Sequence, residues 1–135
     1  MQSDTEAYYG HMDKARGFSQ RAVDSALGAD SKETAASWQM NAALREAEVG
    51  NAAAARQGVS AALALSEGRD VKIIAALTLA RVGDAPKAKA LAAELESSYP
   101  TNTMLKLYWL PTVNAVIALN QGEPVRAMAA LERCV

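Results

Sequence analysis

The residue types that nucleophilic, acid–base or metal chemistry requires are scarce in this chain. His11 is the only histidine and Cys134 the only cysteine among 135 residues. A catalytic triad or a zinc site built on histidine needs partners that one histidine does not have. Glu46 and Glu48 are two residues apart, so they project to different sides of a helix and are interpreted as solvated charges. We therefore expect no catalytic residue, no metal site and no cofactor, with His11 on the surface and Cys134 in a packing role.

The composition favours thin, closely packed helices. Alanine fills 30 positions, against one Phe, two Trp and four Tyr. Alanine has the highest helix propensity, and its small side chain lets helices approach closely. The formal net charge of −1 and the lack of a basic run argue against nucleic acid as a partner. The longest uncharged apolar stretch, 73–80, is too short to cross a membrane, and a single cysteine leaves the cellular compartment open.

Four glycines that each precede a polar residue mark an internal repeat. The pairs are Gly10-His11, Gly50-Asn51, Gly83-Asp84 and Gly122-Glu123, and the glycines are 40, 33 and 39 residues apart. An alanine follows each glycine by five residues, and a small residue precedes each by seven. A glycine adopts the left-handed conformation that ends a helix, and Asn51 or Asp84 can cap the next one. The spacing therefore predicts helical hairpins whose two helices touch at small side chains.

The helix boundaries follow from these stop signals, and we expect an all-α chain without strands. Asp30 and Glu33 have the spacing of a capping box at the start of one helix. Pro111 lies inside an apolar run, where a missing N–H should kink or start a helix. After the tail of a helix over 3–9, about seven helices are predicted, over 12–27, 30–49, 52–66, 71–82, 85–98, a stretch ending at 121, and 124–135.

This pattern resembles the tetratricopeptide repeat, whose unit is a pair of antiparallel helices of about 34 residues. The best match is 71–100, with small Ala76, large Leu79, the turn at Gly83, Ala88 and the closing Pro100. The resemblance implies a right-handed α–α superhelix forming a single repeat domain over 1–135, cut from a longer protein. Its units are a partial one over 1–29 and three over about 30–68, 69–100 and 101–135. The first and third glycine intervals exceed the family length, which implies a longer helix or connecting loop.

Two stretches carry a closer resemblance. The sequences KETAASWQ at 32–39 and AALREAEVGN at 42–51, together with YWLPT at 108–112 and ALNQGEP at 118–124, look like the C-terminal repeats of bacterial eukaryotic-type serine/threonine kinases. Similar repeats follow winged-helix domains in some bacterial transcriptional regulators. No glycine-rich phosphate loop, H-R-D or D-F-G motif is present. The resemblance implies a non-catalytic regulatory or docking region of a signalling protein, with a regulator of transcription as an alternative parent.

The resemblance also implies where a partner would bind. In this family the first helix of each pair lines the concave side, and relatives that grip an acidic peptide terminus carry basic residues there. The matching positions here are largely apolar and include Met40, Leu44, Ile73, Leu77, Trp109 and Val116. Such a groove suits an amphipathic helix, an apolar peptide of another protein, or a segment of the parent chain. Two alternatives stay open: self-association into a homo-oligomer, and aromatic side chains such as Trp109 that only fill gaps between hairpins.

Overall fold

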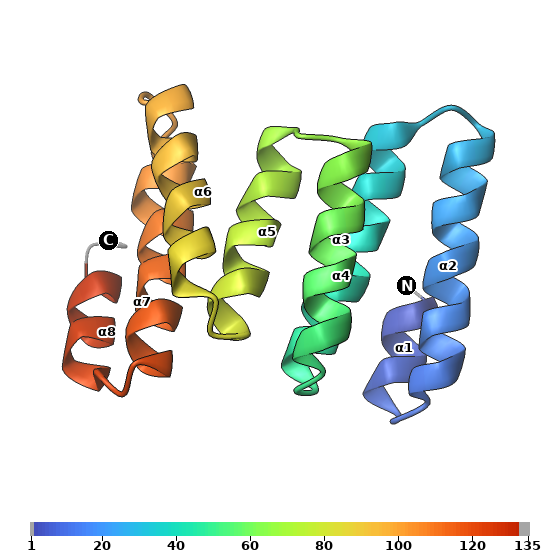
Figure 1. Ribbon diagram of the computed structural model, residues 1–135, viewed down its shortest axis with the longest axis horizontal. Helices are drawn as coiled ribbons and strands as arrows, with labels where there is room; N and C mark the ends of the chain where they lie inside the picture. Colours follow the sequence, from blue (N-terminus) through green and yellow to red (C-terminus); the bar gives the residue numbers. More distant parts are fainter. Residues whose placement is uncertain (1, 133–135) are drawn as a thin grey trace.

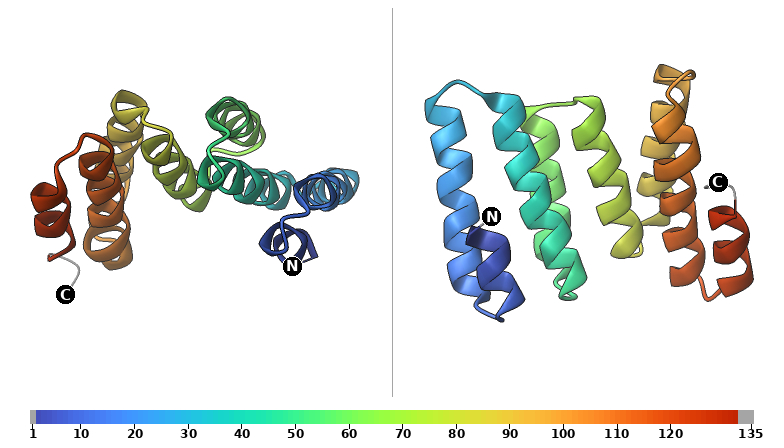
Figure 2. Two further views of the ribbon diagram at one scale, coloured as in Figure 1. Left: turned by 90° about the horizontal axis from the view of Figure 1, so that it is seen from below. Right: turned by 180° about the vertical axis from the view of Figure 1, so that it is seen from behind.

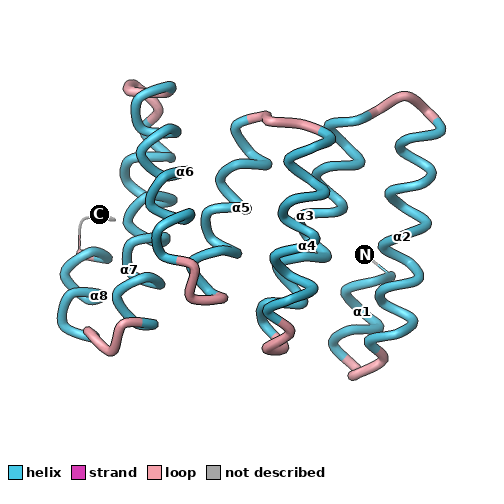
Figure 3. Tube along the Cα trace, in the orientation of Figure 1, coloured by secondary structure: helices cyan, strands magenta, loops and turns pink. Residues whose placement is uncertain are grey.

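The computed structural model describes residues 2–132, and every regular element among them is a helix (Figures 1 and 3). The elements in chain order are α1 (Gln2–Tyr8), α2 (Met12–Gly28), α3 (Lys32–Glu48), α4 (Ala52–Leu65), α5 (Arg69–Arg81), α6 (Ala85–Ser98), the π-helical turn η1 (Leu105–Trp109), α7 (Leu110–Asn120) and α8 (Pro124–Leu131). The expectation of an all-α chain is confirmed for these residues. The predicted helix tail at the N-terminal end is a short helix, α1, so residues 2–132 contain eight α-helices where about seven were expected.

The helices lie side by side in a row, with α1 and α2 at one end and α7 and α8 at the other (Figure 1). Consecutive helices pack against each other within the pairs α1–α2, α3–α4, α5–α6 and α7–α8. The first helices of the last three pairs also contact each other, α3 with α5 and α5 with α7. Seen along the helices, α4 and α6 protrude on one side of α3 and α5, and α1 lies on the other (Figure 2, left). Helix α5 is therefore enclosed by neighbours.

Glycine ends the first helix of each pair as predicted. The backbone φ of Gly10, Gly50, Gly83 and Gly122 lies between 73° and 83°. In each turn the glycine N–H and the next N–H donate to carbonyls of the last helical turn, as in Gly50 to Ala47 and Asn51 to Glu46. This double hydrogen bond is the Schellman motif, which satisfies carbonyls that the helix end leaves free. The Asn51 side chain then caps α4 by accepting from the N–H of Ala54.

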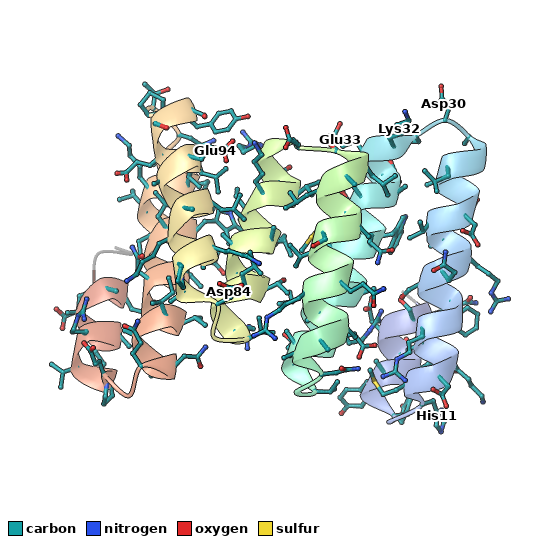
Figure 4. All side chains as sticks on the ribbon, viewed as in Figure 1. His11, Asp30, Lys32, Glu33, Asp84 and Glu94 are labelled. Atoms are coloured by element: carbon teal, nitrogen blue, oxygen red, sulfur yellow. The ribbon has the colours of Figure 1, made fainter. Side chains whose placement is uncertain are left out.

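A fifth turn of the same geometry joins α2 to α3, and here the predicted capping box is wrong. Asp30 has φ 55°, and its N–H donates to Leu27 while that of Ser31 donates to Ala26. Asp30 therefore takes the place that glycine holds in the other turns. The residue before the first turn of α3 is Ser31, whose hydroxyl donates to Thr34. Figure 4 shows Asp30 at the crest of this loop. An aspartate tolerates the left-handed region better than most residues, because its short polar side chain can hydrogen-bond locally.

Small side chains set the contacts within the hairpins. Ala15, Ala55, Ala88 and Ala127, the alanines five residues after each glycine, are all buried. Helices α3 and α4 also approach closely at Gly58 on α4. A Cβ added there would lie 2.8 Å from the Cβ of Ala43 on α3, inside the normal contact distance. Backbone and methyl groups therefore touch directly where α3 and α4 cross.

The unequal spacing of the glycines reflects unequal helix lengths. Helices α2 and α3, between the first two glycines, have 17 residues each, whereas α4 and α5 have 14 and 13. In the third interval, η1 adds a turn before α7. The extra residues therefore lengthen helices, one of the two possibilities that the sequence left open.

Pro111 starts α7 by way of a π-helical turn. The N–H of Leu110 donates to the carbonyl of Leu105, five residues back. Proline lacks an N–H and its ring clashes with the carbonyl four residues earlier, so a widened turn accommodates it. The hydroxyl of Thr112 donates to the carbonyl of Tyr108 at 2.6 Å, which satisfies one group next to the irregular turn. The predicted irregularity at Pro111 is confirmed.

The largest core cluster is centred on α5, which contributes Val71, Ala75, Ala76, Leu77, Leu79 and Ala80. Helices α3, α4, α6 and α7 pack around it. A smaller cluster joins α2 to α3 around Val23, Ala26 and Ala35, and the cluster between α7 and α8 consists of alanines. No helix within residues 2–132 is both long and apolar enough to cross a membrane.

Candidate functional site

Three of the six residues predicted to line a groove lie in the protein's own core. Met40, Ile73 and Leu77 are 1, 5 and 7% exposed. Ile73 and Leu77 belong to α5, whose sides are covered by α3, α4, α6 and α7. Leu77 and Met40 are part of the central cluster, and Ile73 is part of a smaller cluster with residues of α6, η1 and α7. The repeat pattern predicted that these residues lie on an open concave face. This prediction is wrong, because the neighbouring helices cover them. They are not accessible to a partner in this conformation.

The other three predicted groove residues are half-buried. Leu44 lies on α3, Trp109 in η1 and Val116 on α7, and each packs against the central cluster. The Trp109 ring also meets Tyr108 edge to face, with centroids 4.8 Å apart, and contacts the smaller cluster around Leu105. Trp109 therefore fills the gap between hairpins, which was one of its two interpretations.

A hollow does exist at the N-terminal end of the row, between α1 and α3, and it includes Leu44. It has a volume of about 470 Å³. Its apolar lining includes Ala7, Tyr8, Met12, Leu44 and Val49, of which Tyr8 and Val49 are exposed. Asn41 and Glu48, both exposed, add polar groups from α3. Apolar anchors beside a few polar groups are the usual lining of a peptide or ligand site. We name this surface the α1–α3 hollow.

Arg45 fixes the wall of the α1–α3 hollow. Its guanidinium donates to the carboxylate of Asp4 on α1 at 3.1 Å and to the hydroxyl of Ser19 on α2 at 2.6 Å. One side chain thus joins all three helices, and the side chain of Arg45 is mostly buried. A planar guanidinium holds such partners in a fixed geometry. Arg45 could not be singled out from the sequence, because its partners are 26 and 41 residues away.

Glu46 is buried and ion-paired, so its interpretation as a solvated charge is wrong. Only 8% of it is exposed, and Arg16 on α2 donates to both carboxylate oxygens, at 2.7 and 3.1 Å. Asn51 donates to the same carboxylate at 3.0 Å. The hydrogen bond from Arg16 is the main cause that lowers the pKa of Glu46, and burial opposes it. The same pair raises the pKa of Arg16. This network joins α2, α3 and the start of α4.

Two further residues that could take part in chemistry, His11 and Lys72, each lie against a carboxylate. His11, exposed in the first turn, lies 2.7 Å from Glu6 through Nδ1. Lys72 on α5 pairs with Glu94 on α6, which raises the pKa of Lys72. Cys134 lies outside the described residues. Within residues 2–132, no three His, Cys, Asp or Glu side chains gather closely enough to hold a metal ion.

Comparison of the chain with models of protein families, with curated proteins and with solved structures found no match.

Proposed function

We propose that this chain is a non-catalytic protein-interaction module built from tetratricopeptide-like helix pairs that form a right-handed α–α superhelix. We further propose that it is the regulatory or docking region of a bacterial signalling protein such as a serine/threonine kinase. The repeated glycine-ended hairpins and the contacts of α3 with α5 and of α5 with α7 support the repeat architecture. The resemblance of the segments 32–51 and 108–124 supports the signalling parent.

The observation that carries the interaction function is the α1–α3 hollow. Tyr8 and Val49 leave large apolar side chains in solvent beside the half-buried Leu44. Exposed apolar groups rimmed by polar ones are characteristic of protein-interaction sites, since their burial by a partner is favourable. Arg45, held by Asp4 and Ser19, keeps the wall in place before a partner arrives. Less ordering is then needed on binding.

A displayed peptide library tests this proposal. The purified chain is used to select peptides, and their affinities are measured by fluorescence anisotropy with wild type, Leu44→Asp and Leu119→Asp. Leu119 is an exposed leucine on α7 at the other end of the row, so it is a control for the same chemical change. We expect Leu44→Asp to weaken binding of the selected peptides by about tenfold or more, because burying an unpaired charge under a peptide costs more than the roughly 1.4 kcal/mol that a tenfold change represents. Leu119→Asp should bind like wild type.

Circular dichroism of each variant shows whether the helices are retained. If Leu44→Asp unfolds, Val49→Asp replaces it, because Val49 is exposed and lines the same hollow. Selected peptides that bind all folded variants with equal affinity would contradict the assignment of the site to the α1–α3 hollow. Failure to select any saturable binder would contradict the interaction function itself.

Self-association is a second candidate function, and the outer face of α8 favours it. Val125 and Met128 are 79 and 66% exposed, and Leu131 follows at the same three-residue spacing. The three side chains form one apolar stripe at the end of the row. End units of a repeat array need covering, and a second copy would supply it. Light scattering after size-exclusion chromatography would then show a dimer for the wild type and a monomer for Met128→Asp.

A further inference from the structure

The sequence drew attention to the first helices of each pair, but grooves also lie between the second helices. One of them runs between α6 and α8 over α7, as two adjoining hollows of about 460 and 420 Å³ that share Lys89, Asn114 and Ala130. We name it the α6–α8 groove. It is open because its walls are alanines, including Ala93 of α6 and Ala129 of α8. Figure 2 shows α6 and α8 on different sides of α7, at the opposite end of the row from the α1–α3 hollow.

The charged residues that line this groove are mostly basic. Its charged lining consists of Lys89, Lys106 and Arg126 against the single carboxylate of Glu96. Arg126 pairs with Glu123 at 2.6 Å, whereas no ion pair or hydrogen bond within residues 2–132 engages the ammonium of Lys89 or Lys106. The equivalent groove between α2 and α4 differs, because its Arg16 and Glu46 neutralise each other.

Between the charges, the groove presents amides. Asn114 of α7 and Gln121, which follows α7, line the groove; both are exposed, and neither side chain has a hydrogen-bond partner among the described residues. An amide offers one acceptor and two donors, which matches the alternating N–H and C=O groups of an extended peptide backbone. The cationic groups and amides between the alanine walls can therefore bind the side chains and backbone of a peptide that is rich in carboxylates.

We propose that the α6–α8 groove binds an extended acidic peptide segment of a partner protein. The spacing of its polar groups sets the pattern of that segment. Lys106 in η1, Asn114 in α7 and Gln121 just after α7 are separated along the helix axis by at most about 12 and 10 Å at the rise of an α-helix. Lys89 lines the groove beside Asn114, and Arg126 lines it beside Gln121. Three residues of extended chain cover about 10 Å, so the peptide carries Asp or Glu at about every third position.

This inference extends the proposed interaction function to a second surface and does not depend on the α1–α3 hollow. A nucleic acid is a weaker match to the observations, since the chain as a whole carries a net charge of −1 and Glu96 lies in the groove. An acidic peptide has fewer charges than a nucleic acid, and it can bind with Glu96 lying between two of its own carboxylates. The experiment below distinguishes an acidic peptide from a nucleic acid.

The experiment measures fluorescence anisotropy of a labelled peptide that has three aspartates separated by Ala-Ser, with glycine at both ends. The comparison probes are a peptide of identical composition whose three aspartates are contiguous, and a labelled single strand of deoxythymidine. The groove variant is Lys89→Glu with Lys106→Glu. Its matched control is Lys14→Glu with Lys32→Glu, which makes the same change in net charge at exposed lysines of α2 and α3.

We expect the spaced peptide to bind more tightly than the contiguous one and the deoxythymidine strand, and the groove variant to lose about tenfold or more in affinity. The control should change by less than about twofold, because distant exposed charges are screened by salt. Ala129→Trp, which fills the groove without changing its charge, should also weaken binding, whereas Ala53→Trp on exposed α4 surface should not. Equal losses in the two double lysine variants, tighter binding of the deoxythymidine strand, or no saturable binding of the spaced peptide would each overturn the proposal.

Discussion

The crossing of α3 and α4 gives a sharp test of how closely these helices are packed. Replacing Gly58 by alanine would place a Cβ 2.8 Å from the Cβ and 3.3 Å from the Cα of Ala43. Carbon atoms in contact are normally about 3.5–4.0 Å apart, so the two helices must separate. Overpacking of this kind costs roughly 1–3 kcal/mol. Alanine also improves helix propensity by about 1 kcal/mol, which offsets part of the cost.

Gly17→Ala is the matched control, because Gly17 lies inside α2 and an added Cβ there meets nothing within 4 Å. The control keeps the propensity gain and should stabilise the protein by about 1 kcal/mol. Gly58→Ala should therefore be about 1–3 kcal/mol less stable than Gly17→Ala. Urea unfolding followed by circular dichroism measures both free energies of unfolding.

A second substitution identifies the atoms responsible. Ala43→Gly in the Gly58→Ala background removes the methyl group that the new Cβ strikes, so the two substitutions should show a favourable coupling energy in a double-mutant cycle. The reasoning is refuted if Gly58→Ala and Gly17→Ala stabilise the protein equally. That result would mean that α3 and α4 can separate at no cost, and that the small residues of the hairpins do not set helix spacing.

Three further predictions concern the ion pair, the α2–α3 turn and the hairpin contacts. Glu46→Gln should destabilise the protein by about 1–3 kcal/mol at neutral pH. Because the folded state lowers the pKa of Glu46, this difference in free energy of unfolding should shrink as the pH falls below 4.5, the ordinary pKa of a glutamate; urea titrations at several pH values measure it. Asp30→Gly should raise the thermal midpoint, since φ 55° suits glycine better, and a lower midpoint would show that the aspartate side chain contributes more than its backbone strain costs. Ala88→Leu should cost roughly 1–3 kcal/mol because Ala88 is fully buried, whereas Ala53→Leu on the exposed face of α4 should be nearly neutral; equal effects on the urea midpoint would show that the repeat phase is wrong.

The features that the sequence predicted well are local. Gly50 and Gly83 end helices because the left-handed backbone is easiest for a residue without a Cβ, and this depends on nothing distant. The buried position of Ala88 follows from its fixed distance to such a glycine. Pro111 disturbs its helix whatever surrounds it. Helix ends and hairpin contacts could therefore be placed to within a residue or two.

The features that could not be predicted from the sequence depend on contacts between distant segments. Glu46 is interpretable as a solvated charge until α2 brings Arg16 against it from 30 residues away. Gly58 looks like an ordinary helical residue, and only the crossing of α3 shows why a side chain is excluded. Asp30 performs the role of a glycine, so a search for glycines does not find its turn.

The error in the predicted groove has a physical cause that also indicates where binding surfaces are to be sought. Equivalent positions of a repeat have equal exposure only if each unit has the same neighbours. In this chain α5 has α3, α4, α6 and α7 around it, so Ile73 and Leu77 are buried although they match the exposed positions of an open superhelix. At the ends of the row a helix lacks one or more of these neighbours. The accessible side chains of Tyr8 and Val49 on one end and of Lys106 and Arg126 on the other are consequences of that lack. We therefore expect partners to bind at surfaces that include the terminal helices α1 or α8, and not at the covered sides of α5.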